Sequence, residues 1–246
     1  MENPTCRNCE QPVSHNFCAH CGQRTATHRI DMKHLFTHDI LHGVWHLEHI
    51  IVFTIQQSLL RPGKAALEYL DGKRVRFYNV FYLSLMLLGI HFFFDHLYTE
   101  LLPANNEEEE IPKFAQFLIH YLKYVMLGCV PFLAMNGYVI MDRMRMNLAE
   151  HIIMAGIMLV GMLTLLIPMH FLSFLIDKWN IGVFFEKLWI IWGLAILLFP
   201  VWAYINAGGT KYKWWEYTWR FLLFYLLWFF EIIICAGILM AIIGIK

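Results

Sequence analysis

The chain has 246 residues, of which 59% are hydrophobic and only 15% are charged. Soluble domains carry about 25% charged residues, so this composition disfavours a soluble enzyme or binding domain. The formal net charge is zero, which provides no overall field for nucleic acid or an acidic substrate. The first residues contain no apolar stretch of the kind found in signal peptides, so we expect an internal span to direct insertion.

Residues 1–28 are polar, and we predict that they form a zinc ribbon. Two Cys-x-x-Cys pairs stand eight residues apart in this segment: Cys6, Cys9, Cys18 and Cys21. Each pair can supply two thiolates from one turn, and two pairs complete the tetrahedral set that zinc prefers. Gly22 suits the turn behind the second pair. Such a short segment cannot bury enough apolar surface to fold unaided, so the metal would supply its stability.

Four thiolates fill every tetrahedral position, so we predict one structural Zn²⁺ with no room for a substrate or an activated water. Two alternatives stay open at this point. Iron can occupy a four-thiolate site, and His15 or His20 can replace one cysteine.

Residues 29–76 are predicted to form amphipathic helices on the cytoplasmic face of a membrane. A helix over residues 29–60 ends at Arg61-Pro62-Gly63, and a short helix from Lys64 to Leu70 leads into the turn at residues 71–74. Histidines recur along one face of the first helix: His34, His38, His42, His46 and His49. Apolar residues occupy the opposite face, which is typical of an interfacial helix.

The histidine face has three readings. Histidines at i and i+4 can share a second metal ion, or they can sense pH near anionic lipid. The third reading is a solvated polar face that happens to use histidine. Basic residues follow this helix, and we expect them to contact lipid head groups: Arg61, Lys64, Lys73, Arg74 and Arg76.

Residues 77–246 contain five apolar blocks, which predict five transmembrane helices. They run approximately from Phe77 to Leu102, Phe114 to Met141, Leu148 to Ile176, Leu188 to Asn206 and Phe221 to Ile245. Each is long enough for a bilayer core about 30 Å thick, and helices satisfy every backbone group within lipid. The fold class is therefore an all-α integral membrane protein with a small N-terminal zinc ribbon.

Lysine and arginine in the short loops predict the orientation. One side carries Lys73, Arg74, Arg76, Arg143, Arg145, Lys211, Lys213 and Arg220. The other side carries Lys113, Lys178, Lys187, Lys246 and the acidic run at residues 107–110. We expect a multi-pass protein of the inner (cytoplasmic) membrane, with its N-terminus and ribbon in the cytoplasm and its C-terminus outside. Tryptophans at residues 214, 215 and 219 are expected at the lipid interface.

Ionisable residues within predicted spans are functional candidates because burying them is costly. They are His91, Asp95, His120, Lys123, Glu150, His151, His170 and Glu231. Asp95 and Lys123 are a candidate charge pair near the outer surface, and Glu231 has Lys123 or His151 as candidate partners. These groups either form structural pairs and snorkel to the interface, or line a pathway for an ion or a proton.

The chain resembles an uncharacterised bacterial family of multi-spanning membrane proteins with an N-terminal four-cysteine zinc ribbon. The resemblance rests on the order of the ribbon, Arg61-Pro62-Gly63, the run from Tyr69 to Arg74, and Glu150-His151 opening a later span. It covers nearly the whole chain and is strongest from Cys6 to Tyr78. It implies an architecture but carries no activity.

No nucleophile elbow, phosphate-binding loop, dinucleotide fingerprint or HExxH motif occurs in the sequence, which disfavours an enzyme without excluding one. We therefore expect a membrane scaffold or accessory subunit whose ribbon and basic face dock a protein partner. The expected partners are membrane lipids and either another membrane protein or a second copy of the chain, and not nucleic acid. A small transporter or channel is the first alternative, and a metalloenzyme acting on a lipid head group is the second.

Overall fold

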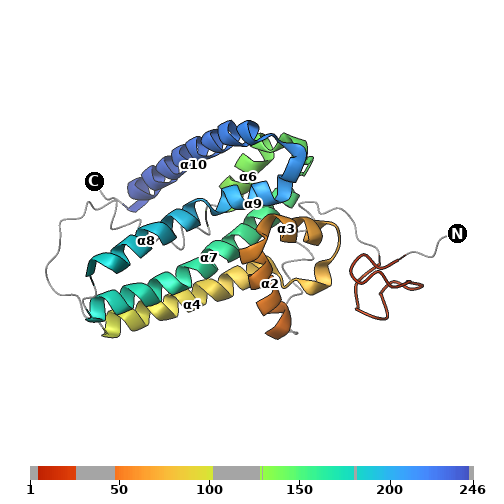
Figure 1. Ribbon diagram of the computed structural model, residues 1–246, viewed down its shortest axis with the longest axis horizontal. Helices are drawn as coiled ribbons and strands as arrows, with labels where there is room; N and C mark the ends of the chain where they lie inside the picture. The colour runs from red at the N-terminus through yellow and green to blue at the C-terminus, as the bar shows by residue number, and fades with distance from the viewer. Residues whose placement is uncertain (1–4, 26–47, 102–127, 129, 180–181, 244–246) are drawn as a thin grey trace.

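The computed structural model describes residues 5–25, 48–101, 128, 130–179 and 182–243 (Figure 1). Helices follow one another along these ranges: α2 Glu48–Leu60, α3 Pro62–Leu70, η2 Arg74–Arg76, α4 Val80–Leu101, α6 Val130–Ile140, η3 Asp142–Met144, α7 Leu148–Trp179, α8 Gly182–Leu197, α9 Phe199–Gly208, η4 Gly209–Lys211 and α10 Trp214–Ile243. Apart from two isolated β-bridges near the N-terminus, regular structure in the described ranges is helical. The predicted all-α class is therefore confirmed.

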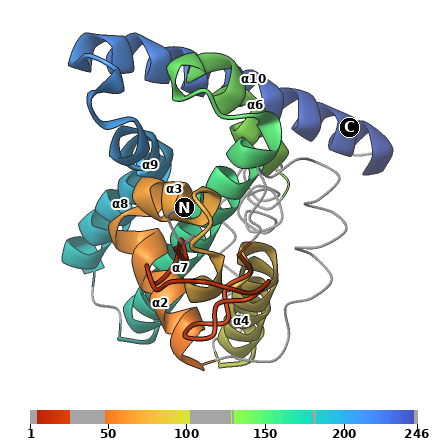
Figure 2. The same ribbon diagram turned by 90° about the vertical axis from the view of Figure 1, so that its right-hand side faces the viewer.

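Helix α7 is the centre of the bundle. It contacts α2, α3, α4, α6, α8 and α9, and 72% of its most apolar window is buried, against 17% for α10. Helices α4 and α10 lie on opposite sides of α7 in both views (Figures 1 and 2). The four-cysteine segment at residues 5–25, called the ribbon below, lies with α3 and the start of α10 toward one end of the bundle, and the later parts of α4, α7 and α10 extend toward the other (Figure 1).

Within the residues that the structure describes, three helices are long and apolar enough to cross a membrane. They cover Arg74–Tyr98, Leu148–Phe174 and Trp214–Cys235, and they overlap the first, third and fifth predicted spans, although the last begins seven residues earlier than predicted. Most of the second predicted span lies outside the described residues, which include its last part as α6. The count of five spans stays a prediction.

The fourth predicted span is bent rather than straight. The segments Ile190–Leu197 and Phe199–Lys211 meet at 41°, and the break falls between α8 and α9. Pro200 lies in the first turn of α9, where its missing N–H interrupts the helical hydrogen-bond ladder. With this pair counted as one span, the described ranges contain up to four candidate spans.

The Arg61-Pro62-Gly63 motif places α3 directly against α9. Pro62 begins α3, a position where its fixed φ suits the first helical turn. A Cβ on Gly63 would lie 2.1 Å from the backbone oxygen of Ala203 and 2.4 Å from the amide nitrogen of Ala207. Asn206 accepts a hydrogen bond from the backbone N–H of Lys64 at 2.8 Å. The motif therefore permits a close helix crossing, as small residues do in membranes.

Candidate functional site

The four cysteines of the ribbon converge as predicted. Their sulfur atoms all lie within 4.8 Å of one another. Two Sγ–Sγ distances are short, 3.6 Å for Cys6–Cys21 and 3.5 Å for Cys9–Cys18. A tetrahedron with Zn–S bonds of about 2.3 Å has edges of about 3.8 Å, so the arrangement is compatible with a bound metal ion. Within the described ranges, no other group of His, Cys, Asp and Glu meets the same geometric test.

The two halves of the ribbon repeat the same backbone design twelve residues apart. In the first half, the Cys6 carbonyl accepts a hydrogen bond from the Glu10 N–H, and the Cys6 N–H donates to the Gln11 carbonyl. In the second half, Cys18 makes the same two bonds with Gly22 and Gln23. Glu10 and Gly22 have φ angles of 63° and 73°. The sequence placed glycine at the second turn, but the matching turn at Glu10 was not predicted because glutamate rarely adopts this conformation.

Local amides favour thiolates in the second half of the ribbon. A hydrogen bond from the backbone of Cys21 lowers the pKa of the Cys18 thiol. Burial raises the pKa of Cys21, but hydrogen bonds from Asn8 and from the Gln23 backbone outweigh it and lower the pKa to about 6. Thiolates are the form that binds metal, so Cys18 and Cys21 are the sulfurs that the local amides favour for coordination. At Cys9 a bond from the Gln11 backbone lowers the pKa, but burial and hydrogen bonds with the other cysteines outweigh it and raise the pKa to about 12.

The ribbon is docked on the loop between α3 and α4. The guanidinium of Arg76 donates to the side-chain oxygen of Asn8 at 3.0 Å and to its backbone oxygen at 2.9 Å. The backbone N–H of Val75 donates to the side chain of Gln23 at 3.2 Å, and Arg7 reaches the Asp71 carbonyl at 3.5 Å. Asn8 and Gln23 belong to different halves of the ribbon, so both halves contact this loop.

Basic residues predicted to contact lipid head groups have several protein partners. Arg61 and Arg76 both pair with Glu68, at 3.2 Å and 3.6 Å. Arg74 lies over the ring of Tyr69 at 5.8 Å from its centroid. Lys64 is exposed and Lys73 is half-buried. The arginines of this loop thus organise the ribbon and α3, and their contact with lipid stays a prediction.

Part of the polar group that the sequence predicts around Asp95 forms. His91 on α4 is buried, and its Nε2 lies 2.8 Å from the Leu163 carbonyl. Its ring centroid is 5.0 Å from that of His170, and His170 Nδ1 is 3.4 Å from Asp95. Three of the predicted residues therefore meet at the interface of α4 and α7. His120 and Lys123, the other predicted members, lie outside the described residues.

Glu231 lies away from the His91, His170 and Asp95 group, at the contact between α6 and α10. Its carboxylate accepts a 2.8 Å hydrogen bond from the side chain of Asn136, a buried residue of α6. The sequence suggested Lys123 or His151 as the partner and missed the amide, because α6 and α10 approach each other only in the folded bundle. Since α4 and α10 lie on opposite sides of α7 (Figures 1 and 2), the described membrane charges do not share one site.

Glu150 and His151 have separate local roles at the start of α7. The side chain of Asn147 accepts from the Glu150 N–H at 2.9 Å, and Glu150 accepts from the Asn147 N–H at 2.7 Å. This reciprocal pair is a capping box. His151 is buried, with Nδ1 3.3 Å from the hydroxyl of Tyr204. Gly137 makes room for this pair, because a Cβ there would overlap the Tyr204 hydroxyl.

The histidine face is mostly beyond the described residues. His34, His38, His42 and His46 lie outside them, and His49 is an exposed residue near the start of α2. The metal and pH-sensing readings of this face therefore stay predictions.

A charged joint between the loop after α6 and the start of α10 was not predicted. Arg143 binds both carboxylate oxygens of Glu216, at 2.9 Å and 2.8 Å, and this contact raises the pKa of Arg143 above its ordinary value. Arg220 pairs with Asp142 at 3.0 Å and donates to the Ile140 carbonyl. Both guanidiniums lie over the ring of Tyr212, at 5.4 Å and 4.7 Å from its centroid.

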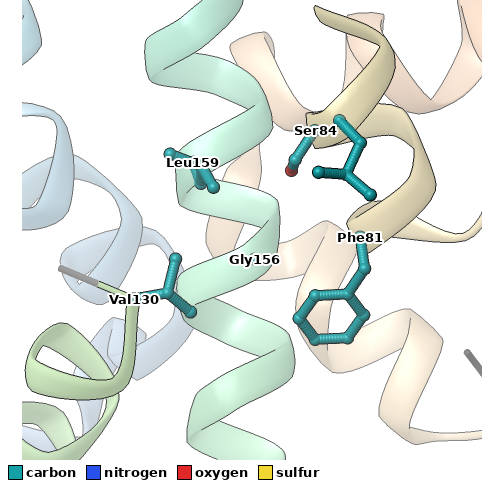
Figure 3. Close-up of a pocket in the computed structure, with 6 residues that line it drawn as sticks. Phe81, Ser84, Val130, Gly156 and Leu159 are labelled. Atoms are coloured by element: carbon teal, nitrogen blue, oxygen red, sulfur yellow. The ribbon is translucent and has the colours of Figure 1, made fainter. Parts of the chain in front are cut away.

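An apolar pocket of about 260 Å³ lies among α4, α6 and α7, lined by Phe81, Ser84, Leu85, Val130, Gly156 and Leu159 (Figure 3). The only hydroxyl among these residues, that of Ser84, donates to the Val80 carbonyl at 2.7 Å. These lining residues offer no titratable side chain for catalysis.

Comparisons of the chain with protein-family models, curated proteins and solved structures found no match.

Proposed function

We propose that this chain is a non-enzymatic membrane scaffold or accessory subunit with a structural zinc ribbon on its cytoplasmic side. In this proposal five helices span the bacterial inner membrane, with the N-terminus inside and the C-terminus outside. The resemblance to multi-spanning ribbon proteins and the distribution of loop lysines and arginines favour this topology.

The observation that carries the proposal is the docked ribbon. Its four sulfurs can complete a tetrahedral zinc site, and one of its surfaces is fixed to residues 71–76. Phe17 remains 59% exposed on the ribbon. A fixed orientation with an exposed aromatic residue suits recognition of a protein, because aromatic anchors dominate many interfaces.

Site-specific photo-crosslinking tests this role in native membranes. Benzoylphenylalanine replaces Phe17 in one variant and the exposed Glu10, in the other half of the ribbon, in the control. We expect a discrete protein adduct from position 17 and a weaker one from position 10. An adduct at twice the 29.1 kDa chain mass identifies a second copy as the partner. If position 17 yields no protein adduct under any growth condition, the scaffold proposal is wrong.

The contact of His91, His170 and Asp95 favours a second candidate, a small transporter or channel. Histidine and carboxylate side chains can pass protons in membrane proteins, and this group joins α4 to α7. Proteoliposome assays with Asp95→Asn and His170→Ala address it, with Glu231→Gln as a control outside the group. Unchanged proton and ion flux in the first two variants would exclude this candidate.

A further inference from the structure

The start of α10 carries an exposed group of tryptophans and lysines. Trp214 is 80% exposed, and Trp215 and Trp219 are about half exposed. Lys211 and Lys213 are exposed immediately before them. Indole rings with water on most of their surface are unfavourable unless another phase covers them. This group therefore indicates contact with something other than water.

The tryptophans begin a continuous apolar stripe on α10. Its exposed members are spaced four and three residues apart: Trp215, Trp219, Leu222, Leu226, Phe229 and Ile233. Residues at this spacing share one helix face, and α10 is long and apolar enough to cross a membrane. The aliphatic and phenyl residues suit the hydrocarbon layer. The tryptophans suit the head-group layer, where an indole can bury its ring and still hydrogen-bond through its N–H.

The two neighbouring arginines, Arg143 and Arg220, form ion pairs within the protein. Glu216 holds Arg143, and Asp142 with the Ile140 carbonyl holds Arg220. These contacts fix the loop that carries Lys211 and Lys213, and the Lys211 carbonyl itself lies 3.3 Å from Arg143. Two exposed ammonium groups are thus held on a rigid loop beside the head-group tryptophans.

The loop before α4 has a different character. There Arg76 binds the ribbon and pairs with Glu68 of α3, and Arg61, which immediately precedes α3, pairs with the same carboxylate. Its arginines are engaged by protein, and the tryptophans at the start of α10 have no counterpart among residues 61–76. Of the two basic loops, the one at α10 is better suited to bind lipid.

We propose that Lys211 and Lys213, with the tryptophans at positions 214, 215 and 219, form a binding surface for the phosphate groups of anionic phospholipids. The lysines contribute attraction to the phosphates, and the tryptophans fix the depth of the loop in the head-group layer. The proposal rests on the membrane location proposed above, but not on the ribbon or its protein partner.

Lipid competition in nanodiscs tests this surface. The full chain is reconstituted in phosphatidylcholine containing a minor fraction of phosphatidylglycerol, and native mass spectrometry measures which lipid remains bound. We expect wild type to retain phosphatidylglycerol selectively. K211Q/K213Q should reduce that selectivity by about tenfold or more at low salt, whereas K211R/K213R should preserve it.

The matched control is K64Q/K73Q, which removes one positive charge from the start of α3 and one from the loop between α3 and α4. It should leave the selectivity within about twofold of wild type, since those lysines are not beside exposed tryptophans. Equal losses in both double variants, or full selectivity in K211Q/K213Q, would overturn the proposal. A wild-type chain that does not enter nanodiscs at all would instead contradict the proposed membrane function.

Discussion

The two loop regions at the ribbon end of the bundle are built from different interactions. The ribbon contacts residues 71–76 through amides, carbonyls and the guanidiniums of Arg7 and Arg76. The joint between the α6–α7 loop and α10 uses paired charges around Tyr212. In the proposed zinc-bound form the folding of the ribbon depends on its metal, whereas the second joint connects helices that are themselves apolar enough to insert. We therefore expect the ribbon to detach independently and the α10 joint to behave as part of the helical bundle.

Metal removal should have the largest effect and should affect only the first region. Apparent binding energies of structural zinc in small domains are about 10–16 kcal/mol, so Cys6→Ser should abolish folding of residues 5–25. Metal analysis should fall from one zinc per chain to none, and limited proteolysis should cut within this segment. Circular dichroism should show that the membrane helices persist. Loss of helix on chelation would contradict the independence of the two regions.

Arg220→Ala should destabilise the second region by about 2–4 kcal/mol. The substitution removes a buried guanidinium and its contacts with the Ile140 carbonyl, Asp142 and the ring of Tyr212. Because Asp142 is exposed to water, losing its partner costs less stability than it would in a buried pair. Thermal unfolding in detergent measures the change, and zinc content is expected to stay at one per chain. Arg220→Lys, which keeps the charge but not the planar group, should lose less. A loss of zinc in either variant would show that the regions are coupled.

Arg76→Ala should detach the ribbon from the loop between α3 and α4 without releasing its zinc. The variant loses two hydrogen bonds to Asn8, and the partial exposure of Arg76 limits the effect to about 1–2 kcal/mol. Proteolysis between the ribbon and α2 should accelerate several-fold while one zinc remains bound. Lys73→Ala, in the same loop, is the matched control. Unchanged proteolysis in Arg76→Ala would show that these contacts do not hold the ribbon in solution.

Glu10→Gly should have the smallest effect, and it should stabilise. Glu10 has a φ of 63°, which glycine adopts without steric cost. We expect the zinc-bound ribbon to gain about 1 kcal/mol of stability. The release of zinc to a chelator should therefore be slower by about fivefold. Gly22→Ala should show the reverse, because its φ is 73° and no atom lies within 4 Å of the added Cβ. Faster release of zinc from Glu10→Gly would contradict the inference that Glu10 and Gly22 occupy equivalent turns.

Features encoded by neighbouring residues were predictable. The Cys-x-x-Cys spacing predicted the cluster of sulfurs, and hydropathy located the long helices α4, α7 and α10. The break at Pro200 had a sequence signal, since proline removes a backbone donor, but a continuous apolar block concealed it. Glu150 was taken for a membrane group although Asn147, three residues earlier, already carried the pattern of a capping box.

The sequence by itself determined where the long apolar helices form and which four cysteines come together, because both depend on composition or spacing over a short stretch of chain. Only the tertiary structure decided the partners of the polar groups. Asn8 meets Arg76 across 68 residues, Arg143 meets Glu216 across 73, and Asn136 meets Glu231 across 95. A carboxylate or guanidinium can be satisfied by many donors or acceptors. The packing of the helices around α7 determines which of them comes within hydrogen-bonding distance.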